Sequence, residues 1–171
     1  GDMTQSNNPG GGGGDQTRGI ITGGASPASD QIQFFNMVSK GNASDFGADQ
    51  PFSGAYAGAF SSPTRTVMFG GRSSPYVAHN SIWFVTTQTT GFVDDFGDYT
   101  NQQHSGAGIL NAAGASSPTR GIIAGGFNNT NPAGQNTNQM EFVTIATTGN
   151  SVDFGDLTTS QQMSKGAASS I

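Results

Sequence analysis

The residue types best able to perform chemistry are scarce in this 171-residue chain. It contains no Cys and only two His, His79 and His104, and no Ser lies in the Gly-x-Ser-x-Gly turn of a serine hydrolase. Without Cys there is neither a thiolate nucleophile nor a Cys-based zinc site, and two unrelated His do not form a transition-metal ligand pattern. The sequence therefore predicts a non-enzymatic protein with no catalytic residues, no metal site and no cofactor.

Acidic residues form two patterns that are typical of ion binding in other proteins. Asp94, Asp95 and Asp98 lie close together and could ligate calcium, but they lack the spaced ligands of an EF-hand loop, which favours a solvated loop. Asp-Phe-Gly, the magnesium-binding triplet of protein kinases, occurs three times without the Lys-bearing strand or the His-Arg-Asp of those enzymes. We expect the Phe of each triplet to pack between sheets and the Asp to cap a turn.

Charge and hydropathy argue against two classes of partner. Six Lys and Arg against 11 Asp and Glu, a net charge of −5, cannot line a groove along nucleic-acid phosphates. No apolar run approaches the roughly 20 residues that span a bilayer, so we expect no membrane insertion. The five glycines of Gly10–Gly14 lack the Gly-Lys-Ser/Thr ending of a phosphate loop, and their composition predicts a flexible loop or linker.

A unit of about 50 residues repeats along the chain and sets its organisation. The motifs that recur in the same order are Thr17-Arg18, Thr64-Arg65 and Thr119-Arg120, then Gly23-Gly24, Gly70-Gly71 and Gly125-Gly126, then Asp45-Phe46-Gly47, Asp95-Phe96-Gly97 and Asp153-Phe154-Gly155. Their positions divide the chain into the trailing segment of a preceding repeat with its Gly-rich loop, at 1–16, and three repeats at 17–63, 64–118 and 119–171.

Two columns of Phe keep a fixed distance while the residues around them vary. Twelve residues before the Phe of each triplet lies another Phe, at Phe34, Phe84 and Phe142, and five residues before it lies a Gly, at Gly41, Gly91 and Gly149. Such constancy predicts that all six rings, Phe34, Phe84, Phe142, Phe46, Phe96 and Phe154, are buried in the core.

The Thr-Arg arginines, Arg18, Arg65 and Arg120, are half of all basic residues. A planar guanidinium suits a carboxylate, so we expect each arginine to pair with an Asp of a triplet, Asp45, Asp95 or Asp153, and to hold adjacent repeats together. The alternative is a ring of arginines that faces a ligand or a channel.

Local patterns predict strands in every repeat and no helix. Arg120-Gly121-Ile122-Ile123-Ala124-Gly125-Gly126 is a short apolar run that ends at a Gly pair, and residues 140–146 are β-branched and aromatic. A third segment, residues 54–60, is rich in Gly and Ala and suits a strand packed tightly against a neighbour. No stretch has the 3.6-residue apolar period of a helix. The fold class is therefore all-β.

The Gly pair, the first Phe and the second Phe follow one another as in kelch repeats. The chain resembles kelch-like β-propeller blades over nearly all of its length, with the Phe of Asp-Phe-Gly in place of the usual Trp. The resemblance implies a repeat protein of propeller blades. A β-solenoid or an intertwined trimeric fibre, also built from Gly-rich short strands, is the alternative.

A second resemblance is to tandem repeats of predicted virion proteins in marine tailed phages, especially cyanophages. It rests on the runs 117–126, 142–150 and 153–157. It implies a structural or adhesive component of a phage fibre, appendage or similar extracellular assembly, located in the virion or outside the cell, with other copies of itself or flanking chain as partners. A glycan-binding propeller that recognises a cell-surface glycan is the alternative. The repeat-specific aromatics Trp83, Tyr76 and Tyr99 are then the expected ligand contacts, and strand alternation should turn Trp83 to the opposite face from Phe84.

Overall fold

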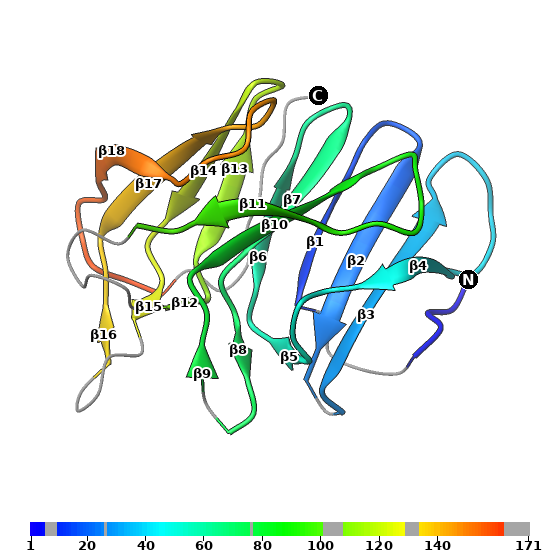
Figure 1. The fold of residues 1–171 in the computed structure, drawn as a ribbon, viewed down its shortest axis with the longest axis horizontal. Helices are drawn as coiled ribbons and strands as arrows, with labels where there is room; N and C mark the ends of the chain where they lie inside the picture. The colour runs from blue at the N-terminus through cyan, green and yellow to red at the C-terminus, as the bar shows by residue number, and fades with distance from the viewer. Residues whose placement is uncertain (6–9, 26, 76, 101–107, 129–133, 163–171) are drawn as a thin grey trace.

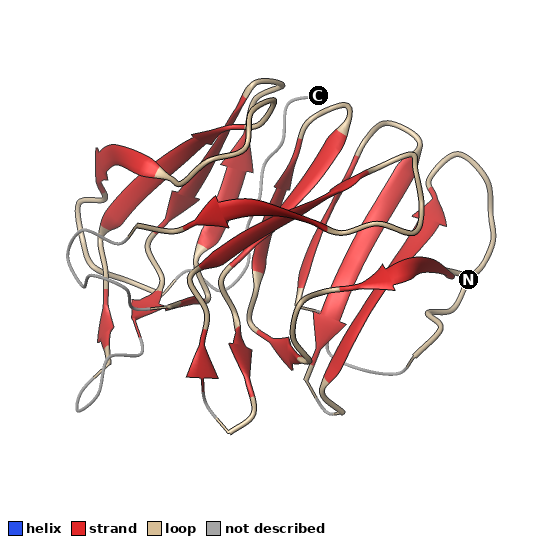
Figure 2. Ribbon diagram, in the orientation of Figure 1, coloured by secondary structure: helices blue, strands red, loops and turns tan. Residues whose placement is uncertain are grey.

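The computed structural model of this chain describes all residues except 6–9, 26, 76, 101–107, 129–133 and 163–171. The described residues form strands and no helix (Figure 2), so none of them lies in a helix able to cross a membrane. Five small antiparallel sheets together make up the blades of a β-propeller (Figure 1). The prediction of an all-β repeat protein with propeller blades is confirmed, in preference to a solenoid or an intertwined fibre.

Three of the sheets have four strands, and we call them the first, second and third blades. The first is β1 (Gly11–Gly14), β2 (Arg18–Gly24), β3 (Ser29–Asn36) and β4 (Ser44–Asp49). The second is β6 (Gly58–Ser61), β7 (Arg65–Phe69), β10 (Ser81–Thr86) and β11 (Asp94–Asp98). The third is β13 (Ala113–Ser116), β14 (Arg120–Ala124), β17 (Gln139–Thr144) and β18 (Val152–Asp156).

The blades stand side by side in chain order, with the first in blue and the third in yellow to orange in Figure 1. Their first strands, β1, β6 and β13, are neighbours. Each of these strands lies before a Thr-Arg motif, so a blade takes its first strand from the end of the preceding sequence repeat. We call the side of a blade that is turned toward the preceding blade its upstream face, and the opposite side its downstream face.

The other two sheets are short continuations of the second and third blades. One is β5 (Gly54–Ala55), β8 (Arg72–Ser73) and β9 (Val77–Ala78); the other is β12 (Ile109–Leu110), β15 (Phe127–Asn128) and β16 (Gln135–Asn136). In each case a Gly pair separates the short sheet from the blade strand before it. Gly70 and Gly71 have φ of 63° and 95°, a left-handed backbone that turns the chain at little steric cost.

The hairpin that opens each blade is closed by a side-chain cap just before the Thr-Arg motif. Asp15 Oδ1 accepts hydrogen bonds from the N–H groups of Thr17 (2.8 Å) and Arg18 (2.9 Å). Ser62 Oγ does the same for the equivalent residues of the second blade, and Ser117 Oγ for those of the third. Asp and Ser are interchangeable here because both place an oxygen within reach of the N–H groups two and three residues ahead.

Asp-Phe-Gly forms an irregularity in the outer strand of each blade. In the second blade Ile82 is opposite Gly97 and Trp83 is opposite Asp95, so Phe96 is the extra residue of a β-bulge. The bulge turns the Phe ring onto the Phe twelve residues earlier: Phe84 and Phe96 meet edge to face, with ring centroids 5.9 Å apart. The predicted turn cap exists at Asp45, which accepts a hydrogen bond from the Gly47 N–H at 2.9 Å.

The hydrophobic core lies between blades. One cluster, between the first and second blades, includes Phe46, Met68 and Trp83; the other, between the second and third, includes Phe96 and Ile123. An apolar face of one sheet is thereby covered by the next sheet, as repeat proteins require.

The six Phe rings do not share one environment. Phe46, Phe84 and Phe96 are buried as predicted, whereas Phe34 and Phe142 are half-buried. For Phe154 the prediction is wrong, since 48 % of the residue is exposed. Phe154 lies on the downstream face of the third blade, where no further described blade covers it.

The Gly-rich run is also different from the prediction of a flexible loop. Residues 11–14 form β1, which pairs in register with β2 and lies beside β6 of the second blade. A Cβ on Gly13 would overlap Ser61 Oγ and come within 2.8 Å of Thr66 Cγ2. The glycines therefore let two sheets approach more closely than side chains would permit.

Candidate functional site

The joints between adjacent blades contain most of the repeated polar groups. Arg18 Nη1 donates to the carbonyl of Thr87 in the second blade at 3.0 Å, and Arg65 Nη1 donates to the carbonyl of Ile145 in the third blade at 2.8 Å. The guanidinium also lies over a Phe of its own blade: Arg18 Cζ is 4.4 Å from the centre of the Phe34 ring. Two of the three arginines thus join neighbouring blades.

The expected Arg–Asp pairs are not formed among the described residues. The guanidinium groups contact backbone carbonyls and Phe rings, while the side chains of Asp45, Asp95 and Asp153 are exposed. An ion pair with an exposed carboxylate contributes little to stability because the carboxylate is already well hydrated. A buried carbonyl without a donor is costly, so a hydrogen bond from the guanidinium stabilises the fold more. Arg120, also exposed, lies over Phe142 with its Cζ 4.8 Å from the ring centre. The arginines therefore do not form a ring around a described channel.

A backbone hydrogen bond crosses each joint at the Phe of Asp-Phe-Gly. The Gly91 N–H donates to the Phe46 carbonyl at 2.9 Å, and the Gly149 N–H donates to the Phe96 carbonyl at 2.7 Å. Both glycines have positive φ, 96° and 154°, in the turn before the outer strand of the next blade. The fixed spacing of Gly and Phe in the sequence is thus explained by this contact.

The segment after Asp95-Phe96-Gly97 adds side-chain bonds to the second joint, which lies between the second and third blades. Thr100 N and Oγ1 donate to the buried Glu141 carboxylate at 3.2 Å and 3.1 Å. Ser151 Oγ and Gln139 Nε2 donate to the same carboxylate. Four donors balance the desolvation of this carboxylate without a cationic partner, so the second blade is held on the third by polar contacts.

At the first joint a polar contact lies at the hairpin end of the blades. Gln88 Nε2 of the second blade donates to Asp15 Oδ2 at 2.6 Å and to Thr17 Oγ1 at 2.8 Å. Burial raises the pKa of Asp15, but the hydrogen bonds from Gln88, Thr17 and Arg18 outweigh it and leave the pKa below its usual value.

Two of the three aromatic residues expected to contact a ligand, Trp83 and Tyr99, are buried. Trp83 is only 1 % exposed and packs edge to face on Phe52, with ring centroids 5.4 Å apart. Tyr99 is also 1 % exposed; burial and the nearby Glu141 carboxylate raise the pKa of its phenol. Strand alternation placed Trp83 opposite Phe84 correctly, but both faces of the second blade are covered by a neighbouring blade. Tyr76 and His104 lie outside the described residues.

The acidic cluster is likewise part of a strand. Asp94, Asp95 and Asp98 belong to β11, with exposed side chains, and not to the predicted loop. Within the described ranges no group of three or more His, Asp or Glu side chains could hold a metal ion.

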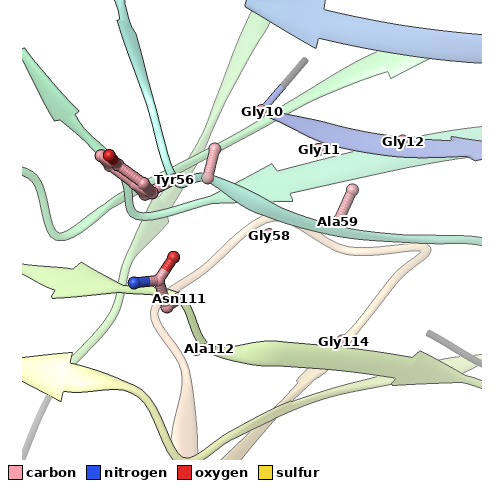
Figure 3. A pocket seen from close by; sticks show the side chains of 10 residues that line it. Gly10, Gly11, Gly12, Tyr56, Gly58, Ala59, Asn111, Ala112 and Gly114 are labelled. Atoms are coloured by element: carbon pink, nitrogen blue, oxygen red, sulfur yellow. The ribbon is translucent and has the colours of Figure 1, made fainter. Parts of the chain in front are cut away.

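A pocket lies at the first strands of the blades, and the sequence did not indicate it. Its volume is about 290 Å³, and most of its lining consists of Gly and Ala that lie in β1, β6 and β13 or directly before them (Figure 3). Two larger side chains, Tyr56 and Asn111, line it from equivalent positions two residues before β6 and β13. Their φ values are 67° and 53°, and the Asn111 N–H donates to the Tyr56 carbonyl at 3.2 Å.

The Tyr56 and Asn111 side chains are the two groups in this pocket able to recognise a ligand. Arg72 Cζ lies 4.8 Å from the centre of the Tyr56 ring. A left-handed backbone at a non-Gly residue costs energy and is often found at functional sites. Tyr56 and Asn111 each lie two residues before a strand of small residues, and this shared position is the sequence signal that could have identified them. Because one is Tyr and the other Asn, comparison of the repeats did not align them.

Fold and joints together define this chain as an all-β repeat protein of propeller blades. No protein-family model matches its sequence, and the comparison with curated proteins found no match. The function is therefore inferred from the geometry of the joints and of the pocket.

Proposed function

We propose that this chain is a non-enzymatic structural or adhesive component of a phage fibre, a phage appendage or a similar extracellular assembly. The observation that carries the proposal is the joint between blades: the same backbone bond crosses both joints, and the Phe whose carbonyl accepts it packs edge to face on an equivalent Phe of its own blade. A joint of this kind uses residues present in every repeat, so it can be repeated to build an extended or closed body.

The composition agrees with such a role. Charged residues are 10 % of the chain, and most of its polar side chains are uncharged. The buried carboxylates, Asp15 and Glu141, are hydrogen-bonded within the joints. The proposed location, in the virion or outside the cell, rests on the resemblance of the repeats to those of predicted virion proteins in marine tailed phages.

Immunogold labelling tests the proposed location. Antibodies raised against the purified chain are applied to concentrated marine tailed phages, especially cyanophages, and pre-absorption with the purified chain is the control. We expect gold on tails or fibres that the pre-absorption removes. Label confined to host cells, with bare particles, would contradict a virion role.

Glycan binding at the pocket is the second candidate function, favoured by the Tyr56 ring and the Asn111 amide in one cavity. An aromatic face and an amide are groups that proteins use to hold a neutral sugar, and a pocket of this kind with few polar groups is suited to a small ligand.

A glycan array with the wild type and the Tyr56→Gly variant tests this function. Gly accepts the left-handed backbone, so the substitution removes the ring without adding strain. Loss of the signal in this variant, with the signal kept in Phe92→Ala, is the expected result; the bound glycan should be recovered with unchanged mass. Equal signals for Tyr56→Gly and the wild type would contradict glycan binding at this pocket.

A further inference from the structure

Among the described residues, the row of blades ends in two faces that no further blade covers. On the upstream side, Ile21 of the first blade is half-buried, whereas Met68 and Ile123 at the same position of the second and third blades are completely buried. Residues that pair across neighbouring strands point to the same face of the sheet. Ile21 pairs with Gln33, as Ile123 pairs with Glu141, so these side chains are all on the face toward the preceding blade.

On the downstream side the third blade shows the complementary change. Phe154 is 48 % exposed, whereas Phe46 and Phe96 at the same position are 0 % and 2 % exposed. Ile122 is half-buried, and its equivalent in the second blade, Val67, is completely buried. The two end faces are therefore the two halves of a joint of the kind that lies between the blades.

A short segment of the chain already lies on the upstream face of the first blade. Asp2 N donates to Asn42 Oδ1 at 2.9 Å, Ala43 N donates to the Asp2 carbonyl at 2.8 Å, and Thr4 N donates to Gln33 Oε1 at 2.8 Å.

The second joint contains the same three bonds. Asp98 N donates to Asn150 Oδ1 at 2.9 Å, Ser151 N donates to the Asp98 carbonyl at 3.0 Å, and Thr100 N donates to Glu141 Oε2 at 3.2 Å. Residues 1–4 are Gly-Asp-Met-Thr and residues 97–100 are Gly-Asp-Tyr-Thr. The upstream face of the first blade thus binds a Gly-Asp-x-Thr segment.

The downstream end of the chain carries a third copy of this segment. Residues 155–158 are Gly-Asp-Leu-Thr, directly after Phe154. We propose that the downstream face of the third blade docks on the upstream face of the first blade of a second copy, with residues 155–158 in the place of residues 1–4. The inference rests on the proposed structural function, for which it names the partner.

The exchange of segments has a favourable balance. The incoming segment forms the bonds that the outgoing one gives up; residues 1, 2 and 4 are exposed, and Leu157 takes the place of the half-buried Met3, so little packing is lost. The new contact adds burial of Phe154 and Ile21, together with a bond from the Gly41 N–H to the Phe154 carbonyl, equivalent to the bonds of Gly91 and Gly149. Apolar burial therefore drives the docking.

Two single variants test the docking by light scattering of the full chain after size-exclusion chromatography. Phe154→Asp alters only the downstream face and Ile21→Asp only the upstream face. Because both residues are partly exposed, each variant should stay folded, which circular dichroism checks. Phe92→Asp is the matched control, since Phe92 is 69 % exposed in a turn of the second blade.

We expect the wild type and Phe92→Asp to have a mass above the 17.4 kDa of one chain that rises with concentration, and each end variant to have the mass of one chain. A head-to-tail joint needs one good face from each partner. An equimolar mixture of the two end variants should therefore form a dimer and no larger species.

Other outcomes separate this inference from the proposed function. A wild-type monomer at all concentrations, or a mixture that stays monomeric, would overturn the docking and leave the virion role to be decided by immunogold labelling. Association that is lost in Phe154→Asp but kept in Ile21→Asp would indicate a symmetric contact between two downstream faces and would also overturn it. Bare phage particles would contradict the virion role without affecting self-association.

Discussion

Equivalent Phe residues of the second and third blades should differ in their contribution to stability, because only one of them is covered. Phe96 is 2 % exposed and contacts Phe84, so Phe96→Ala leaves a cavity and should cost about 3–5 kcal/mol. Phe154 is 48 % exposed, so about half of its transfer free energy is at stake and no closed cavity forms; Phe154→Ala should cost about 1 kcal/mol.

Urea unfolding at equilibrium measures both losses. It is performed in the Ile21→Asp background, which keeps the chain monomeric, and is followed by circular dichroism and by the fluorescence of Trp83, the single Trp. With a slope of about 2 kcal/mol per molar urea, the midpoint should fall by roughly 2 M for Phe96→Ala and by roughly 0.5 M for Phe154→Ala. Phe92→Ala is the exposed control. Equal shifts for Phe96→Ala and Phe154→Ala would refute the conclusion that burial between blades determines how much each ring contributes to the free energy of unfolding.

Three other substitutions test separate features. Gly13→Ala should lower the free energy of unfolding by about 1–3 kcal/mol because its Cβ meets the second blade, whereas Gly12→Ala, at an exposed position, should be close to neutral. Thermal unfolding measures both, and an unchanged melting temperature in both variants would indicate a flexible linker in place of a packed strand. Arg65→Met should cost about 1–2 kcal/mol through loss of a carbonyl bond and a ring contact, and Arg120→Met, which has no carbonyl partner among the described residues, should cost less in urea unfolding. Burial lowers the pKa of His79 below 6.5, so the folded state binds fewer protons than the unfolded state. The contribution of neutral His79 to stability is therefore complete above pH 6.5 and is lost as the pH falls toward the folded-state pKa. In a pH series, the melting temperature of the wild type should fall over this range more than that of His79→Gln.

The period and the register of the repeat were sufficient to predict the strands of each unit, and the resemblance to kelch repeats added the propeller blade. The constant distance from Gly to Phe exists because the Gly N–H of one blade bonds the Phe carbonyl of the blade before it. Strand alternation likewise placed Trp83 and Phe84 on opposite faces. These features depend on the backbone and on one residue at a time, so a single sequence contains them.

Exposure could not be predicted in the same way, because it depends on which neighbour covers a face. Phe154 has the same local sequence as Phe96 and yet is half in solvent, since no further described blade lies beyond it. Trp83 is unique to its repeat, which is typical of a contact residue, but Phe52 covers it. The glycines of β1 resembled a linker because the requirement for them comes from the second blade, which is distant in sequence.

The choice of partner at each joint follows from one repeat position, occupied by Gln33, Trp83 and Glu141. Trp83 belongs to the apolar cluster that Ala48 packs against in the first joint, where no Gly-Asp-x-Thr segment is present. Gln33 and Glu141 each accept a hydrogen bond from the Thr of such a segment. A Gly-Asp-x-Thr segment placed over Trp83 would leave its Thr N–H without an acceptor, at a cost of about 1–3 kcal/mol. The segment at residues 155–158 is therefore matched to a blade that has Gln or Glu at this position, and within this chain the first blade is the one that offers it at an uncovered face.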